Sequence, residues 1–363
     1  MLARIFRAHG PAHWPEKSFN NHWGVPLTLA RMPQGTERAV FEIGMSTPGE
    51  IAPRSRMVRP HCAIITRIAG VHLEGLGSIE AIAEEKSDLF AGLEAGGAAV
   101  LPAEDQFFDR MKARALEAVG DAEVLSFGKG ETCDARILSY AADGQGCRIV
   151  LDVLGSPVDV HLEAVGEHWA FNVAAAILAS VSTARLSAEE AANALTGFAP
   201  PKGRGQVEVL NLPSGGQATL VDDGYNANPT SMRASLTALS SRPAGRRLLV
   251  LGAMGELGPE SKSQHAALAA PVMDAGPEAV WLVGDDMKAL ADALPGTIQK
   301  HWAVKANDLL EPVKNALRDG DTLLIKGSNA SGMVMFAEAL RQWSEGPTDG
   351  VMESGVENGA RGQ

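Results

Sequence analysis

Short apolar segments alternate with amphipathic helical segments along two stretches of this chain, and this alternation constrains the fold more than any other feature. In the first stretch, apolar runs at 39–44, 61–68 and 97–102 are separated by helical patterns at 49–58 and 78–93. Strands that alternate with helices in this way predict a parallel sheet with helices on its faces.

A different pattern interrupts this alternation between residues 122 and 162. Short alternating runs are divided by turns there, and the Asp143-Gly144 turn predicts an antiparallel hairpin. Two helices are expected next, over 168–184 and 188–195. The fold class expected for the first part of the chain is therefore α/β, a mostly parallel sheet with a small antiparallel part.

The segment GFAPPKGRGQ at 197–206 is the best linker candidate, because proline and glycine cluster there. A second alternation follows it and predicts a Rossmann-like, doubly wound unit. We expect domains at 1–203 and 204–345, a hinge near 202–206 where glycines allow large backbone changes, and a disordered tail at 346–363.

Composition excludes several classes of partner. The net charge is -12 and no block of Lys or Arg occurs, so duplex nucleic acid and anionic membranes are poor partners. No apolar run reaches the ~18 residues of a membrane span, and the first residues lack the apolar core and cleavage site of a signal peptide. Three cysteines without CxxC spacing favour reduced thiols. We expect a cytoplasmic protein, a monomer.

Three polar residues in the first part stand where packing alone would not place them. Glu42 lies within the apolar 39–44 run, near its carboxyl end, and His72 follows the 61–68 run by a few residues. A solvent-facing carboxylate and a hydrogen-bonded loop histidine are the ordinary explanations. Lys86 falls within the apolar stripe of the 78–93 helix, whereas Glu84 and Glu85 lie on its polar side. A lysine there either snorkels to water or enters one site with Glu42 and His72.

The second unit has three polar strings at strand ends. DDGYNANPTSM (222–232) places carboxylates and amides where they can read ribose hydroxyls or a purine edge, and it is also an ordinary turn with a helix cap. LLVLGAMGELG (248–258) lacks the spacing of the dinucleotide fingerprint, so it is a weak cofactor signal. LLIKGSNASG (323–332) puts Lys326 and Ser328 at a strand-to-helix junction that suits an anion such as a carboxylate.

Taken together, these segments resemble one family, the Mur ligases, over about residues 9–335. The strings that carry the resemblance are long and in order: NNHWGVPLTLARMP (20–33), FEIGM with GEI (41–51), VRPHCAIIT (58–66), VHLEGLGSIEAIAEEKSDLF (71–90), DDGYNANPTSM, MGELG and KGS. The last three strings narrow the resemblance to members that take D-alanyl-D-alanine.

The resemblance implies an ATP-dependent amide-bond ligase of peptidoglycan precursor synthesis. Its implied partners are UDP-N-acetylmuramoyl-tripeptide and D-alanyl-D-alanine, which would be joined through an acyl phosphate. Two alternatives stay open. One is another member of the wider family, adding a single amino acid or glutamylating folate, and the other is a non-catalytic remnant that binds a nucleotide or a partner.

The resemblance also implies a role for each candidate residue. The implied magnesium ligands are Glu42, His72 and Lys86, with Lys86 carbamylated by CO2. Arg204 matches an arginine near the γ-phosphate, and Lys86 and Arg204 are the implied catalytic residues. The implied ATP contacts are His168, Asn172, Asp223 and Asn226. The implied substrate contacts are Asn20, Asn21, Lys326 and Ser328.

Some positions depart from the family pattern. Ala253 stands where Asp is usual, residues 329–332 replace a more basic stretch, and Trp169 stands where Asn is common. Residues 1–363 contain no G-x-x-G-K-[ST] loop, and the family's uridine-nucleotide domain has no counterpart in them. Because that loop cradles the phosphates through its N–H groups and lysine, we expect residues 1–363 alone to be poorly soluble, to bind ATP weakly and to show no measurable ligase activity.

Overall fold

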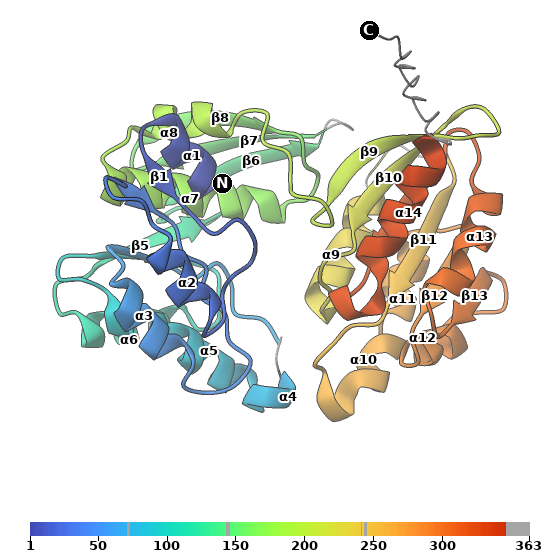
Figure 1. The fold of residues 1–363 in the computed structure, drawn as a ribbon, viewed down its shortest axis with the longest axis horizontal. Helices are drawn as coiled ribbons and strands as arrows, with labels where there is room; N and C mark the ends of the chain where they lie inside the picture. The colour runs from blue at the N-terminus through green and yellow to red at the C-terminus, as the bar shows by residue number, and fades with distance from the viewer. Residues whose placement is uncertain (71–72, 143–145, 241, 243–244, 346–363) are drawn as a thin grey trace, which may run out of the picture.

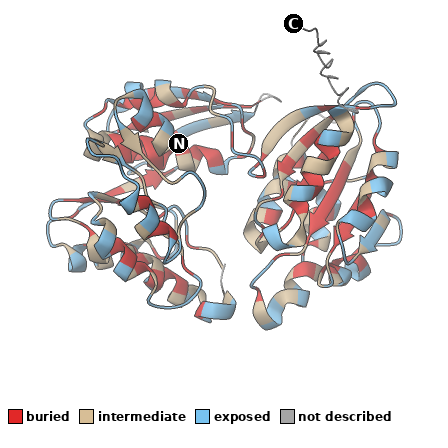
Figure 2. Ribbon diagram, in the orientation of Figure 1, coloured by how far each residue is buried: buried red, intermediate tan, exposed pale blue. Residues whose placement is uncertain are grey.

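The structure is a computed structural model that describes residues 1–70, 73–142, 146–240, 242 and 245–345. Figure 1 shows two α/β units joined by a single connection between α8 (Ala188–Leu195) and β9 (Gln206–Asn211). Each unit has its own six-stranded sheet and its own buried interior (Figure 2). The expected fold class is confirmed, whereas His72, the Asp143-Gly144 turn and the 346–363 tail lie outside the described residues.

The sheet of the first unit has the strand order β3-β4-β5-β6-β7-β8. The pairs from β3 to β6 are parallel, and the last two pairs are antiparallel, as the short alternating runs predict. The strands span Cys62–Ile64 (β3), Ala98–Pro102 (β4), Glu123–Gly128 (β5), Ala135–Ala142 (β6), Cys147–Val153 (β7) and Ser156–Leu162 (β8).

Helices cover both faces of this sheet because successive strand residues point to opposite sides. Val100 of β4 packs in a cluster with α1 (Leu2–Ala8), α7 (His168–Ala184) and α8. Its neighbours Ala99 and Leu101 pack in the other cluster, with α3 (Ile51–Val58), α5 (Ile79–Ser87) and α6 (Phe108–Ala118). The expected ends of α7 and α8 are both confirmed. A capping box at Ser187 begins α8, since its side chain and that of Glu190 bond each other's backbone N–H groups.

The prediction of a strand at 39–44 is wrong. Only Arg38–Ala39 (β2) pairs, with Ala12–His13 (β1), in a separate two-stranded sheet. Beyond it, Val40 N donates to His13 O at 2.9 Å and Gly44 N donates to Asn20 O at 2.9 Å. The apolar run is therefore extended but held by the 12–20 segment, because a strand needs a neighbouring strand as well as a suitable pattern.

The sheet of the second unit has the strand order β13-β12-β11-β14-β10-β9, parallel except for β9 at one edge. Sequence reasoning missed β9 and β13. The other strands match expected ones. Their bounds are Gln217–Asp223 (β10), Arg247–Gly252 (β11), Ala279–Val283 (β12), Gln299–Ala303 (β13) and Thr322–Lys326 (β14).

Helices also cover both faces of this second sheet. One face carries α9 (Pro229–Ser240), α11 (Ala269–Asp274) and α12 (Met287–Ala293), and the other carries α13 (Asn307–Ala316) and α14 (Met333–Glu345). The single helix expected at 263–274 is divided into α10 (Ser261–Ala266) and α11. Pro271 has no N–H to donate to Ala267 and its ring crowds that carbonyl, which accounts for the division.

The remaining short elements of the first unit are α2 (Gly24–Ala30), α4 (Leu73–Leu76) and a 3-10 turn at Asp88–Gly92. Within the described part of the chain, every helix is too short or too polar to cross a lipid bilayer.

Candidate functional site

Asn20 and Glu42, predicted for different roles, lie together in the first unit. Asn20 Nδ2 donates to Glu42 Oε1 at 3.0 Å, and the Asn20 carbonyl accepts the Gly44 N–H. A Cβ at Gly44 would lie 2.8 Å from Asn20 Nδ2, so the contact requires glycine there. Glu42 is exposed, which leaves its carboxylate open to further partners.

Asn21 has a local structural role. Its Oδ1 accepts the backbone N–H groups of Trp23 at 3.1 Å and Gly24 at 2.9 Å, at the start of α2. These bonds satisfy donors that a helix leaves free in its first turn. Contact between Asn21 and a substrate stays a prediction.

Lys86 is half-buried, and its side chain reaches the segment after β3. Its Nζ donates to the Arg67 carbonyl at 2.9 Å. Burial lowers the pKa of Lys86, and the Asp105 carboxylate opposes this shift. Asp105 in turn fixes the same segment, because its Oδ2 accepts the Ile68 N–H at 2.8 Å.

A common metal site of Glu42, His72 and Lys86 stays a prediction, since His72 lies outside the described residues. Within the described ranges, no three His, Cys, Asp or Glu residues gather as a metal site would require. The contact of Lys86 with the Arg67 carbonyl directs its side chain toward the segment that follows β3.

Glu85 corrects the assignment of α5's polar side. It is buried, and its carboxylate accepts the N–H groups of Gly49, Glu50 and Ile51 at 2.7, 2.8 and 2.8 Å. These are the first donors of α3, where a negative charge is favoured. The pattern within α5 could not reveal this, because the partners lie more than thirty residues earlier.

Glu50 holds the loop in front of α3. Its carboxylate accepts the N–H groups of Ser46 at 2.6 Å and Thr47 at 3.0 Å, and Arg54 Nη2 donates to it at 2.8 Å. The two backbone bonds, helped by Arg54, lower the pKa of Glu50 to about 2. Loop 46–50 is thereby fixed between Glu50 and Glu85.

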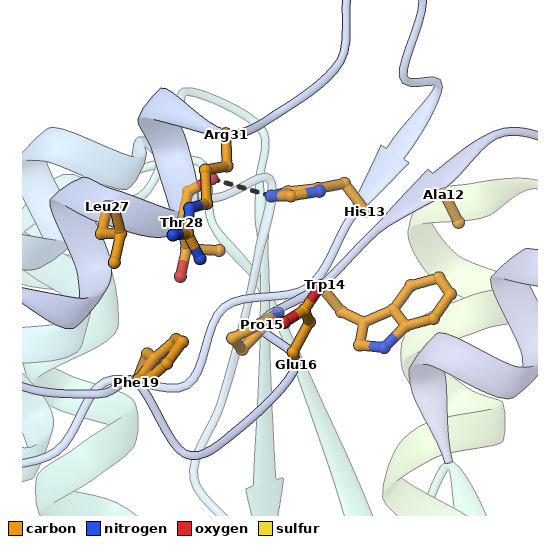
Figure 3. Close-up of a pocket in the computed structure, with 9 residues that line it drawn as sticks. All are labelled: Ala12, His13, Trp14, Pro15, Glu16, Phe19, Leu27, Thr28 and Arg31. Atoms are coloured by element: carbon orange, nitrogen blue, oxygen red, sulfur yellow. Dashed lines mark hydrogen bonds between the residues drawn. The ribbon is translucent and has the colours of Figure 1, made fainter.

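A cavity of about 310 Å³ lies against the segment before Asn20 (Figure 3). Its lining combines the aromatic and apolar side chains of Trp14, Phe19 and Leu27 with the charged groups of Glu16 and Arg31. This combination suits a ligand with both apolar and polar parts. Sequence reasoning did not single out this cavity.

His168 and Asp223 face each other from the two units. Both line a small pocket that also includes Ser235 and Leu239 of α9. Burial lowers the pKa of His168; Asp223 opposes this shift and Lys326 adds to it. Asn172 is one turn further along the same face of α7. The predicted nucleotide contacts of the first unit thus lie on the side that meets the second unit.

Trp169, a departure from the family pattern, is buried beside the linker. Its ring lies 6.0 Å from that of Phe198, and its Nε1 would lie 4.0 Å from a Cβ at Gly205. Among the described residues, this indole N–H has no hydrogen-bond partner.

Lys326, Asp223 and Asn226 come together at the carboxyl end of the second sheet. Lys326 is 2% exposed, and its Nζ donates to Asp223 Oδ2 at 2.7 Å and to the Asn226 carbonyl at 3.1 Å. Ser235 Oγ also donates to Asp223 Oδ2, at 2.6 Å. The pairing register of β10 and β14 places Asp223 opposite Lys326. This contact between a predicted substrate residue and a predicted nucleotide residue was not foreseen.

Two further predicted residues border this cluster. The Arg204 guanidinium lies 4.4 Å from the centroid of the Tyr225 ring, and its side chain is exposed. Ser328 N donates to the Ala253 carbonyl at 3.1 Å, which connects the KGS string to the MGELG string.

His265, which sequence reasoning missed, fixes the MGELG string. It is fully buried, Met254 N donates to its Nε2 at 2.9 Å, and its Nδ1 lies 2.7 Å from the Ser261 carbonyl. Only the neutral ring with its proton on Nδ1 satisfies both bonds. Burial lowers the pKa of His265, in agreement with a neutral ring.

Known proteins share both units. Residues 1–180 match a family described as the Mur ligase middle domain, and residues 203–329 match the Mur ligase, glutamate ligase domain. The UDP-N-acetylmuramoyl-tripeptide--D-alanyl-D-alanine ligase of Rickettsia prowazekii is 30% identical over 311 residues, covering 86% of this chain and 68% of the relative. The ligase of the same name from Bacillus subtilis is 31% identical over 352 residues, covering 96% and 73%.

A solved structure agrees with these matches. A crystal structure of MurF from Acinetobacter baumannii superposes with a TM-score of 0.83 at 26% identity, over 94% of this chain and 72% of that one. The matches place the chain among α/β ligases. It belongs to the Mur ligase family.

Proposed function

We propose that this chain provides the active-site domains of an ATP-dependent ligase. The ligase joins D-alanyl-D-alanine to UDP-N-acetylmuramoyl-tripeptide in the cytoplasm. The relatives from Rickettsia prowazekii and Bacillus subtilis carry that activity in their names. The structural observation that carries the proposal is the cluster of His168, Asp223 and Lys326 where the two units meet. A ligase must bring nucleotide, acid and amine together, and such a boundary gives access to residues of both domains.

The reaction proceeds in two steps. The terminal carboxylate of the tripeptide attacks the γ-phosphorus of ATP, which forms an acyl phosphate and releases ADP. The amine of D-alanyl-D-alanine then attacks the acyl carbon, and phosphate leaves as the amide forms. Both steps depend on positioning and on neutralising phosphate charge.

We assign the nucleotide to the boundary between the units. His168 and Asn172 would hold the adenine, while Asp223 and Asn226 would face the ribose. Arg204 is exposed beside them, so its guanidinium is free to bind the γ-phosphate.

Glu42 and His72 would hold magnesium, which neutralises charge on the transferred phosphoryl group. The fit rests on donor chemistry. Glu42 is exposed and has one described partner, the neutral amide of Asn20, so its carboxylate oxygens remain available to a hard cation.

The surroundings of Lys86 support its carbamylation. Its Nζ faces a neutral carbonyl, and burial lowers its pKa. A lowered pKa raises the fraction of neutral amine, the form that adds to CO2. The product is an anionic carbamate, a second oxygen donor for magnesium.

Ligase assays on two proteins test the proposal. One is residues 1–363, and the other is a chimera in which the part of the Bacillus subtilis relative that this chain does not cover precedes residue 1. We expect the chimera to release phosphate from ATP only with both the tripeptide precursor and D-alanyl-D-alanine, and to form the pentapeptide product.

The same assay separates the alternatives. A chimera that accepts single amino acids or folate, and not the dipeptide, would contradict the dipeptide assignment while keeping the ligase class. A folded chimera that binds ATP without turnover would favour a non-catalytic remnant.

A further inference from the structure

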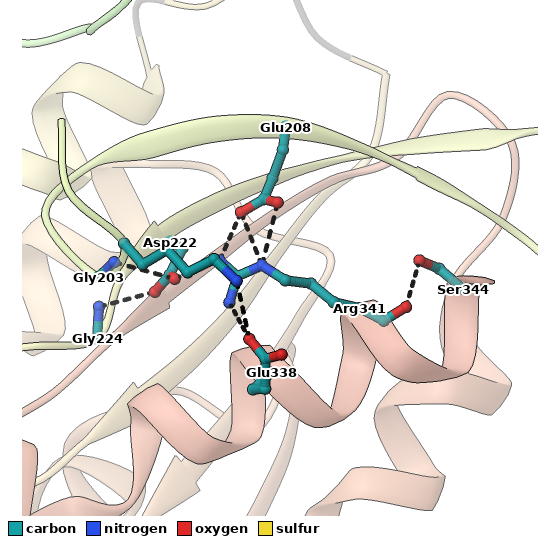
Figure 4. Close-up of polar contacts among 8 residues, drawn as sticks. Gly203, Glu208, Asp222, Gly224, Glu338, Arg341 and Ser344 are labelled. Carbon is teal, nitrogen blue, oxygen red and sulfur yellow. Dashed lines mark hydrogen bonds and ion pairs between the residues drawn. The ribbon is translucent and has the colours of Figure 1, made fainter. Parts of the chain in front are cut away.

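Arg341 lies in a buried polar network on the face of the second sheet that is covered by α14 (Figure 4). Its Nε donates to the Glu208 carboxylate at 3.0 Å, and its Nη2 donates to Asp222 Oδ2 at 2.5 Å. Glu338, one turn earlier on α14, accepts from Nη1 at 3.2 Å. One guanidinium therefore connects α14 to both β9 and β10.

Asp222 joins Arg341 to the linker, because its carboxylate accepts hydrogen bonds from both Arg341 and Gly203. It is fully buried, and its carboxylate accepts the N–H groups of Gly203 at 3.1 Å and Gly224 at 3.2 Å. Its neighbour Asp223 points to the other face, toward Lys326, because successive residues of a strand alternate. The Asp222 carboxylate thus holds the linker, whereas the Asp223 carboxylate pairs with Lys326.

The linker is held on both sides of Arg204. Gly203 donates to the Asp222 carboxylate, and its carbonyl accepts the Tyr225 N–H at 3.0 Å. Gly205 N donates to the Asp222 carbonyl at 2.8 Å. Both glycines have positive φ, at 79° and 82°, which fixes a tight path that side-chain-bearing residues rarely adopt.

We propose that Arg341 is a positioning residue for Arg204. Through Asp222 it fixes the backbone at Gly203 and Gly205, and so aims the Arg204 guanidinium, stacked on Tyr225, toward the nucleotide. The assignment rests on the proposed function for the nucleotide that Arg204 would face.

The hydrogen bonds of the linker also bear on where the two units can move relative to each other. Residues 203–206 belong to the second unit, because three hydrogen bonds tie them to β10 and to Tyr225. Lys202 is also tied, through an ion pair with Glu338 at 3.3 Å. If these contacts persist, a hinge between the units would lie before residue 202 rather than within 202–206, and Arg204 would move with the second unit.

Arg341→Lys is the test variant, since lysine keeps the charge but cannot bridge three carboxylates. Arg246→Lys is the matched control. Arg246 forms a comparable fork with buried Asp321, at 2.8 and 2.7 Å, at the opposite end of the same sheet. If Arg341→Lys does not fold, Asp222→Asn replaces it, because this change keeps the side-chain shape.

The chimeric ligase and its variants are examined by NMR and by ATP titration, because residues 1–363 alone are expected to bind ATP weakly. In Arg341→Lys, we expect the Gly203 and Gly205 amides to exchange with solvent about ten- to a hundredfold faster than in Arg246→Lys, as loss of a bond to a charged group predicts. The Arg204 Nε–H resonance should lose its ring-current shift from Tyr225, and ATP affinity should fall in this variant alone.

Equal amide exchange in the two variants, or an unchanged Arg204 resonance, would overturn the positioning role. Lost Arg204 order with unchanged ATP affinity would also overturn it, since Arg204 would then not serve the nucleotide. An unsubstituted chimera that does not bind ATP would contradict the proposed function, and the NMR comparison would still decide whether Arg341 orders Arg204.

Discussion

The two units treat a lysine near the proposed site in opposite ways. In the second unit, Lys326 is almost fully buried and paired with Asp223 at 2.7 Å. In the first unit, half-buried Lys86 donates to the neutral carbonyl of Arg67, and burial lowers its pKa. Burial disfavours the charged form of a lysine unless an opposite charge compensates for it. The second unit therefore pairs its buried lysine with a carboxylate, whereas the first unit leaves Lys86 on a neutral partner.

The strongest test of this comparison is Lys86→Ala in the chimeric ligase. If Lys86 becomes a carbamate that supports magnesium, we expect the ligation rate to fall by about 10²–10³ or more, the loss typical of one electrostatic donor. Short carboxylic acids should restore part of the rate by replacing the lost anion. Exposed Lys112→Ala is the control. Wild-type rates in Lys86→Ala would contradict the carbamate role.

The same substitution in both units tests stability directly. Lys326→Met leaves Asp223 without its cation, and we expect the free energy of unfolding to fall by about 3 kcal/mol, the lower part of the range for broken buried pairs, since Asp223 is partly exposed. Lys86→Met removes an ammonium that burial disfavours, so its effect should stay within about 1 kcal/mol or be stabilising. Urea unfolding measures both.

A double variant separates the ion pair from packing. Lys326→Met with Asp223→Asn removes both charges, and it should recover part of the stability that Lys326→Met loses. A double variant as unstable as the sum of the two single changes would show that the Lys326–Asp223 pair contributes no coupling.

Glu85 is a buried charge of the first unit that caps α3, and its replacement should have a smaller effect on the free energy of unfolding. Glu85→Gln keeps the shape of the side chain but weakens three bonds to the start of α3, so the free energy of unfolding should fall by about 1–2 kcal/mol. Its neighbour Glu84→Gln is the control, because Glu84 is exposed and its ion pairs with Arg110 and Arg114 are on the surface. Equal losses in the two variants would refute the capping role of Glu85.

The smallest expected effect is the contribution of one buried histidine of the second unit, His265, to the pH dependence of stability. The pKa of His265 is lowered in the folded state, so below pH ~6.5 the unfolded chain binds a proton that the folded chain does not. Stability should therefore fall as pH falls, by at most ~1.4 kcal/mol per pH unit. Urea unfolding followed at Trp281 should detect it. His265→Gln should reduce this slope and leave the part that comes from His168, whose pKa burial also lowers. An unchanged slope would contradict the assignment.

Much of the fold could be predicted because local patterns carried it. Helix α7 and the capping box of α8 follow from residues close in sequence, as do strands β11, β12 and β14, whose central residues are apolar and buried. The errors arose where a distant partner decides. Segment 39–44 has a strand pattern without a partner strand, and β13 is an edge strand with an exposed, mixed sequence.

The candidate site was predicted as a set of residues but not as a set of contacts. The resemblance supplied Asp223 and Lys326 separately, while only the register of β10 and β14 brings them together. Glu85 lay on the expected polar side of its helix, yet the start of α3 buries it. Arg341 and His265 carry no local signal, because each acts on a backbone segment from another element.

Asp222 and Asp223 are adjacent in β10 but contact residues on opposite faces of the sheet. A change in the length of β10 would therefore disrupt both sets of contacts. Deleting one residue between 217 and 221 would turn every later side chain of the strand to the other face. If Asp223 then took the place of Asp222, Gly224 would stand opposite Lys326. The buried Lys326 ammonium would lose its carboxylate partner. Insertions and deletions in homologous genes should therefore collect in the turn at 212–216, where Leu212 N donates to the Gly216 carbonyl and the strands have not yet begun to share their partners.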